Sequence, residues 1–132
     1  MQIPEVNITR RYYCSQEKLW NAIAEGQLFI LTGADQKTAS FEFKKTGKIS
    51  LNWNDYSTSM TGEFLEITPM SKVVLTWNTS QKVNSTVFLT IQPFEKYCEL
   101  NLRHEFPSGT ETKAYDWGWD ESMYDLKELL YK

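Results

Sequence analysis

The sequence has few of the residues that build metal centres and disulfide frameworks. Its 132 residues include two cysteines and one histidine, too few for the usual zinc clusters or for a fold held together by disulfides. Neither a G-x-G-x-x-G nor a P-loop pattern occurs, so no loop that cradles a phosphate is expected. We therefore expect a protein without a metal or another cofactor.

Long apolar runs and an excess of positive charge are missing as well. The longest run of large apolar residues covers 28–31, whereas a membrane-spanning helix needs about 20 residues. The chain has 14 basic and 17 acidic residues, which disfavours nucleic-acid binding because proteins of that class present a basic surface. The first residues lack the basic and apolar regions of a secretory signal. These features predict a cytoplasmic protein that binds neither membranes nor nucleic acid.

Aromatic residues, by contrast, are abundant. Five tryptophans, seven tyrosines and seven phenylalanines predict large packed faces or an aromatic-lined hollow. The length fits one ordinary domain. No repeat or linker divides the sequence, so residues 1–132 are expected to form a single domain.

The spacing of apolar residues predicts an α+β fold. Alternation predicts a strand over 5–14, and Ser15 then suits the N-cap of a helix that Gly26 ends. A short second helix is expected over 28–31. From about 38 to 106 the period is two, which predicts six strands joined by short turns. A bulge is expected where the phase slips between Phe64 and Ile67.

The last element is expected to be a long helix with Asp116 as its N-cap. Trp119, Met123, Leu126 and Leu130 recur at helical spacing and form one apolar stripe. A sheet with one face to cover and a helix with a matching stripe form a two-layer domain.

Several motifs in this order resemble those of a known superfamily. They are Arg10-x-Tyr12-x-Cys14-Ser15-x-Glu17-x-Leu19-Trp20, Gly62-x-x-Leu65-Glu66-Ile67-x-Pro69 with Val73-x-Leu75-x-Trp77, Cys98-x-Leu100-x-Leu102-x-His104, and Gly118-Trp119-x-x-x-Met123-x-x-Leu126. Over about residues 6–130 the chain resembles the START-related helix-grip superfamily (SRPBCC), and within it the activator of heat shock protein 90 ATPase homologue family. The resemblance implies an antiparallel six- to seven-stranded sheet wrapped around a long C-terminal helix.

The resemblance also implies a function. It is that of a non-catalytic binding module with a stress-response role, which holds a small apolar ligand or a protein partner in the groove between the sheet and the last helix. The competing class is an enzyme of the polyketide cyclase/dehydratase type that uses the same cavity. The inward-facing positions offer only Arg10 and His104 as polar groups. Because an enzyme needs an acid–base pair within reach of its substrate, these residues favour binding.

One departure from the family pattern disfavours the chaperone as a partner. Family members that bind the chaperone usually carry Trp-Arg after the central strand, and this chain has Trp77-Asn78. A small apolar molecule or another protein partner is therefore favoured over the chaperone, and no pattern indicates an oligomeric state.

The candidate cavity residues share an expected orientation toward the covered face of the sheet. They are Arg10, Tyr12, Phe43, Trp77, Leu89, Leu102, His104, Trp119 and Met123. We expect an apolar pocket of roughly a few hundred cubic ångströms, with Arg10 and His104 at one end and segment 28–38 as a lid. The alternatives are an Arg10 that reaches the rim of the sheet and a His104 that is hydrogen-bonded at a strand end. Two interpretations also stay open for a group of aromatic residues, which line a cavity or belong to an ordinary core: Trp53, Trp77, Phe106, Trp117 and Trp119.

In the implied fold the first and last strands are neighbours, which would bring Cys14 near Cys98. The two are either a redox pair or two small buried side chains in a reducing compartment. If they lie opposite each other, Arg10 lies opposite Leu102 and diagonal to His104. Cys98 and His104 are six residues apart on one strand, a separation of roughly 20 Å. This excludes a metal site or a catalytic dyad built from Cys98 and His104.

Overall fold

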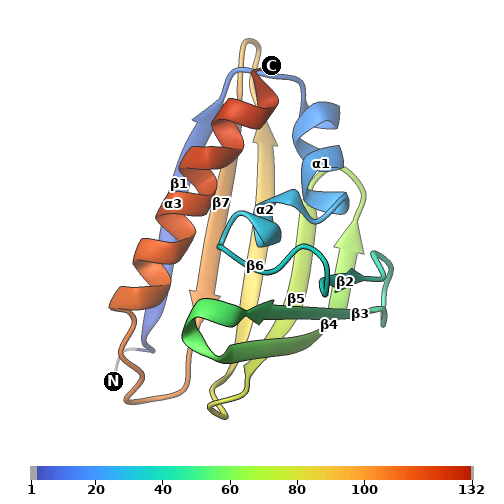
Figure 1. The fold of residues 1–132 in the computed structure, drawn as a ribbon. Helices are drawn as coiled ribbons and strands as arrows, with labels where there is room; N and C mark the ends of the chain where they lie inside the picture. Colours follow the sequence, from blue (N-terminus) through green and yellow to red (C-terminus); the bar gives the residue numbers. More distant parts are fainter. Residues whose placement is uncertain (1–2, 132) are drawn as a thin grey trace.

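The structure, a computed structural model, describes residues 3–131 apart from the side chain of Tyr56 (Figure 1). Its elements in chain order are β1 (Glu5–Tyr12), α1 (Gln16–Ala24), α2 (Gln27–Ile30), β2 (Ser40–Phe41), β3 (Lys48–Trp53), the short 3-10 helix η1 (Asn54–Tyr56), β4 (Thr58–Thr68), β5 (Lys72–Thr79), β6 (Asn84–Pro93), β7 (Cys98–Glu105) and α3 (Lys113–Leu130).

The seven strands form one antiparallel sheet in the order β1-β7-β6-β5-β4-β3-β2. Helix α3 crosses one face of this sheet, and α1 and α2 lie beside it over the same face (Figure 1). The first and last strands pair as expected. The β4–β5 register shifts between Phe64 and Glu66, which confirms the predicted bulge. The architecture is therefore the predicted α+β helix-grip fold.

Several predicted boundaries differ from the structure. The first strand was expected to reach residue 14 but ends at Tyr12, because the Cys14 N–H donates to the Tyr12 carbonyl at 2.9 Å and turns the chain. The strand expected to contain Phe41 and Phe43 ends at Phe41, because the Lys44 N–H bonds the Glu42 carbonyl at 2.8 Å and turns the chain. Helix α3 begins at Lys113, before Asp116, because the Asp116 N–H already donates to the Thr112 carbonyl at 2.9 Å. Asp116 therefore lies in the first turn, where its carboxylate faces the positive end of the helix dipole.

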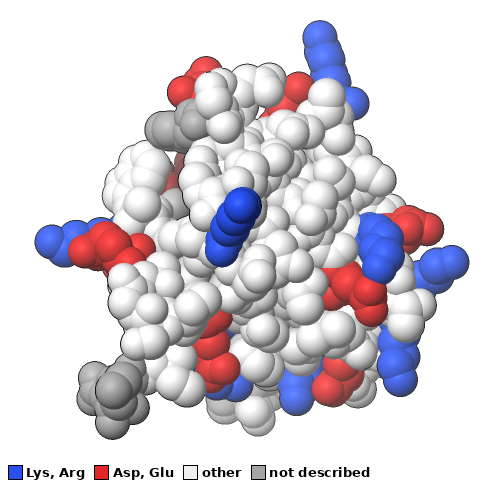
Figure 2. All heavy atoms as spheres, turned by 90° about the horizontal axis from the view of Figure 1, so that it is seen from below, with Lys and Arg blue, Asp and Glu red and all other residues white. Residues whose placement is uncertain are grey.

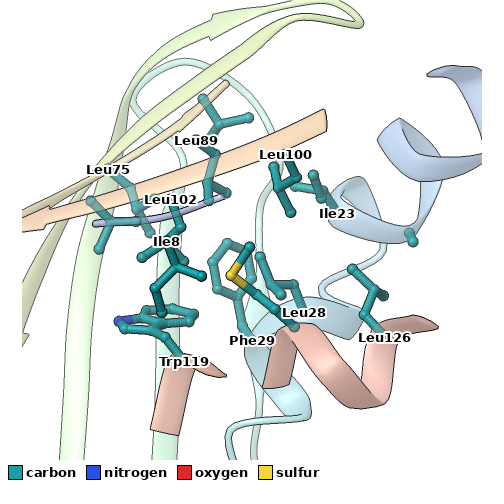
Figure 3. Packing of buried hydrophobic residues seen from close by; sticks show 14 of the residues in the cluster. Ile8, Ile23, Leu28, Phe29, Leu75, Leu89, Leu100, Leu102, Trp119 and Leu126 are labelled. Atoms are coloured by element: carbon teal, nitrogen blue, oxygen red, sulfur yellow. The ribbon is translucent and has the colours of Figure 1, made fainter. Parts of the chain in front are cut away.

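The apolar stripe of α3 is buried as predicted. Its residues Trp119, Met123, Leu126 and Leu130 all belong to the core. Figure 3 shows sheet side chains, among them Leu89 and Leu102, pointing toward the residues that α2 and α3 contribute.

Helix α2 fills the middle of the groove between the sheet and α3. Its Leu28 and Phe29 are fully buried, and both lie among the core side chains in Figure 3. The buried Ser122 of α3 donates a hydrogen bond to the Leu28 carbonyl and so joins the two helices. The first part of the segment expected to act as a lid therefore fills the groove, and a cavity lies toward the N-terminal turns of α3.

Candidate functional site

A cavity of about 360 Å³ opens at the end of the groove. The N-terminal turns of α3, the ends of β3, β4 and β5, and the residue Thr32 after α2 surround it. Its lining residues are Thr32, Trp53, Thr58, Trp77, Thr79, Gln81, Ala114, Tyr115, Trp117, Gly118 and Trp119. Figure 2 looks onto this end of the molecule from below. It shows charged side chains mainly around the rim, with one basic side chain projecting from a largely uncharged centre.

Four of the five tryptophans of the chain line this cavity. Trp77 and Trp119 are almost fully buried, and their ring centroids lie 5.0 Å apart. Trp53 packs against Trp77 at 6.0 Å. Trp117, in contrast, is 63 % exposed, so one wall of the cavity borders solvent. Indole rings on several sides favour flat, apolar guests.

The polar groups of the cavity are neutral. None of the lining residues carries a formal charge. The Trp53 Nε1–H donates to Thr32 Oγ1 at 3.0 Å, and Gln81 Nε2 donates to Thr58 Oγ1 at 2.9 Å. Burial raises the pKa of the Tyr115 hydroxyl, so this group stays protonated at neutral pH. Hydroxyl and amide groups of this kind orient a ligand without selecting for charge.

Gly118 leaves part of the cavity open. A Cβ built at this position meets no atom within 4 Å, although the residue lies inside α3 and lines the cavity. A glycine inside a helix costs about 1 kcal/mol relative to alanine. Gly118 therefore lowers the stability of α3, and its missing side chain leaves space in the cavity.

A fully buried histidine supports the cavity wall from behind. The Trp119 indole N–H donates to His104 Nδ1 at 3.0 Å, and His104 Nε2 lies 2.7 Å from Ser85 Oγ. The Ser85 hydroxyl donates to the Trp77 carbonyl at 2.8 Å. This series of hydrogen bonds connects β5, β6, β7 and α3 behind Trp77 and Trp119.

The direction of these hydrogen bonds determines what His104 can do. Because an indole N–H only donates, Nδ1 must accept, and the proton of the neutral ring lies on Nε2. Nε2 then donates to Ser85 and cannot remove its proton, so this Ser–His pair is not an activated nucleophile. Burial lowers the pKa of His104 from 6.5 to about 3. The structure thus agrees with the alternative interpretation of His104, a hydrogen-bonded histidine at a strand end.

Arg10 does not form the polar end of this cavity. The β1–β7 register places Arg10 opposite Leu100 and not Leu102, and its guanidinium pairs with Asp120 of α3 in a half-exposed ion pair. Because β1 is an edge strand that α3 covers, the Arg10 side chain reaches the rim of the sheet, which was the alternative interpretation of this residue. The expectation that Arg10 and His104 lie together at one end of the cavity is therefore wrong.

Of the other predicted cavity residues, only Trp77 and Trp119 line the hollow. Tyr12 is buried and its hydroxyl donates to the Met123 carbonyl at 2.7 Å. Phe43 packs edge-on against Trp20 and Phe64. Three residues belong to the closed core: Leu89, Leu102 and Met123.

Several lining residues escaped the sequence analysis. Thr79 and Gln81 lie at the β5–β6 turn, and Thr58 begins β4. Tyr115 and Ala114 lie in the first turn of α3. Their sequence context indicates turns and helix ends, and no periodicity marks them. Trp53 and Trp117 had been weighed as cavity or core residues, and both line the cavity.

The two cysteines lie close together, and both are free thiols. The Cys98 thiol donates to the Cys14 carbonyl at 3.5 Å. Burial raises the pKa of both thiols, which lowers their thiolate fraction and hence their reactivity. This environment favours the interpretation of two small buried side chains.

Residues 3–131 contain no group of three or more acidic, cysteine or histidine side chains placed to hold a metal ion. Among the described helices, none has the length and apolar character needed to cross a bilayer.

Three solved structures have the same fold as this chain at low sequence identity. The solved structure of MLL2253 from Mesorhizobium loti has a TM-score of 0.82 at 21 % identity, over 96 % of each chain. CalU16 from Micromonospora echinospora has a TM-score of 0.78 at 18 % identity, over 96 % of this chain and 75 % of its own. DynU16, a protein of the dynemicin biosynthetic locus, has a TM-score of 0.78 at 11 % identity, over 97 % of this chain and 47 % of its own. These likenesses show the fold.

The sequence comparisons bear on the family. The search of curated proteins returned no match. The family model "Activator of Hsp90 ATPase homolog 1-like protein" matches residues 13–131, nearly the whole chain. The chain therefore belongs to the family of activator of Hsp90 ATPase homolog 1-like proteins, as its motifs suggested.

Proposed function

We propose that this chain is a non-catalytic binding domain that holds a small, uncharged, largely aromatic molecule. The observation that carries the proposal is the cavity of about 360 Å³, lined by four tryptophans and by no charged residue. Its volume lies within the range of small-molecule sites. A charged ligand would lose its hydration without gaining an ionic partner, so neutral ligands are favoured.

The same lining favours binding over the cyclase/dehydratase alternative. General acid–base catalysis needs titratable groups within hydrogen-bond reach of the substrate. Tyr115 is the titratable residue among those that line the cavity, and burial raises its pKa further. His104 lies behind Trp119 with both ring nitrogens engaged. We propose a cytoplasmic location with this function, because two neighbouring free cysteines are typical of reducing compartments.

Filling the cavity should weaken this binding. We expect the neutral aromatic dye N-phenyl-1-naphthylamine to bind at micromolar level, about −8 kcal/mol. In the Gly118→Leu variant the new side chain occupies cavity space, and the affinity should fall about tenfold or more, about 1.4 kcal/mol. Fluorescence titration measures both dissociation constants.

The matched control places a leucine on another helix. Asn21 is exposed on α1, away from the cavity, and Asn21→Leu should leave the dye affinity unchanged. An unaltered affinity in a folded Gly118→Leu protein, or no dye binding by the parent chain, would contradict the proposal.

Chaperone activation is expected to be weak or missing. Trp77 is buried in the cavity wall, and Asn78 follows it where chaperone-binding members of the family usually have arginine. An assay of the cognate Hsp90 ATPase with added chain should show little stimulation. Strong stimulation by the parent chain would make the chaperone the partner instead.

A further inference from the structure

The outer face of α3 presents an unusual row of exposed aromatic residues. Trp117 and Tyr124 are 63 % and 62 % exposed, and Tyr131, at the end of the helix, is 44 % exposed. The three are spaced seven residues apart, so they lie along one side of the helix and span about 21 Å. Large aromatic side chains are costly to leave in water, and in such rows they are typical of interaction surfaces.

Acidic side chains run beside this row. These acidic residues are spaced four and three residues apart, so they form a second row on the surface of α3: Glu121, Asp125 and Glu128. In the part of the chain that the structure describes, no ion pair involves any of the three. Like charges three and four residues apart repel one another. The helix therefore keeps an unfavourable charge arrangement that a basic partner would relieve.

The basic residues near this face do not neutralise it. Arg10 pairs with Asp120 on the flank toward β1, and Lys127 lies over the Tyr131 ring at 6.0 Å. Figure 1 shows no other element of the chain in front of α3. The aromatic row and the acidic row are thus open to a partner along most of the helix.

We propose that this face of α3 binds an amphipathic α-helix of another protein, with apolar residues at heptad spacing and Lys or Arg along one flank. The spacing of seven matches the repeat at which two helices pack along each other. Basic side chains of the partner would meet Glu121 and Glu128. A second copy of α3 would bring acidic rows together, so charge disfavours self-association. Tyr124, Glu121 and Glu128 do not line the cavity, and Trp117 is the residue that this surface shares with the proposed ligand site.

A charge-swap experiment tests the proposal. Two synthetic peptides of the length of α3 carry leucine at heptad positions, one with Lys and Arg on the flank and the other with Glu in their place. Calorimetric titration should show binding of the basic peptide alone. Tyr124→Ala should weaken it about tenfold. The pair Glu121→Lys and Glu128→Lys should abolish binding of the basic peptide and create binding of the acidic peptide.

The matched control carries the same change of charge elsewhere. Glu17 in α1 and Glu95 in the β6–β7 turn are exposed, and converting both to Lys should leave binding of the basic peptide unchanged. Equal binding of both peptides, an equal loss in this control, or no exchange of preference in the double variant would overturn the proposal. So would a dimer of the free chain that Tyr124→Ala dissociates in sedimentation, because the occupant would then be a second copy.

Discussion

Gly62→Ala is expected to lower the free energy of unfolding by about 3 kcal/mol or more. A Cβ at this position would lie 2.1 Å from the Thr76 carbonyl oxygen and 3.1 Å from Ile49 Cγ2. The first of these atoms belongs to the backbone of β5, so a change of side-chain rotamer cannot remove the clash. The two strands would have to separate at this position.

The close approach at Gly62 also positions the candidate site. The β4–β5 ladder pairs Thr61 with Asn78 and Phe64 with Leu75, and between them the Glu63 N–H donates to Thr76 Oγ1 at 2.9 Å. Trp77 follows Thr76 directly and forms part of the cavity wall. A displaced β5 would move this tryptophan, so we expect Gly62→Ala to weaken dye binding even where the protein still folds.

The control is the same substitution at the other glycine discussed above. Gly118 has free space around its missing Cβ, and Gly118→Ala should stabilise the protein by about 0.5–1 kcal/mol through helix propensity and unfolded-state entropy. Urea denaturation of both variants gives the two free energies. A Gly62→Ala protein as stable as its parent would show that β4 and β5 are farther apart than described.

Apolar periodicity predicted the faces of the strands but not their register. Arg10 was assigned correctly to the side of β1 that also carries Ile8 and Tyr12, yet it lies opposite Leu100 instead of Leu102. A shift of two residues returns every side chain to the same face, so a period of two cannot detect it, whereas a shift of one would reverse the pattern. The predicted neighbour of Arg10 was wrong for this reason.

The position of the cavity was hard to predict because it depends on the segment after α1. The composition of this segment does not show whether it covers the groove or fills it. A short apolar run such as 28–31 suits a lid and a plug equally well, because both bury apolar side chains. Leu28 and Phe29 fill the centre of the groove, and the hollow is left at one end. The long amphipathic helix was easier to predict, since its stripe of Trp119, Met123 and Leu126 extends over several turns.

The stability of the protein should fall steeply as the pH is lowered from 6.5 toward 3. Burial holds His104 neutral and lowers its pKa from 6.5 to about 3, so the unfolded chain binds a proton that the folded protein excludes. Protonation would also place a hydrogen on Nδ1, opposite the Trp119 indole N–H. The contribution of His104 is complete above pH 6.5, declines as the pH falls below it, and is lost near pH 3.

The expected loss follows from the linkage between proton binding and folding. One proton corresponds to about 1.4 kcal/mol per pH unit, which amounts to about 2 kcal/mol at pH 5 and about 3.4 kcal/mol at pH 4 relative to neutral pH. His104→Gln keeps a neutral donor and acceptor at this site, and its unfolding free energy should lack this component. The difference between the two pH profiles, measured by urea denaturation, separates the contribution of His104 from that of every other titratable group.

The protonation of His104 can also be measured directly in the parent protein, which does not require the His104→Gln variant to fold. The chain has one histidine, so its imidazole gives a single set of NMR signals in the folded protein. The Cε1–H resonance should keep its neutral position down to pH 4, because the ring takes up no proton while the core is intact. A folded protein whose imidazole titrates near pH 6.5 would show that the Trp119–His104–Ser85 network is open to solvent. The wall behind the cavity would then be a mobile surface, and the tautomer that prevents activation of Ser85 would no longer be fixed.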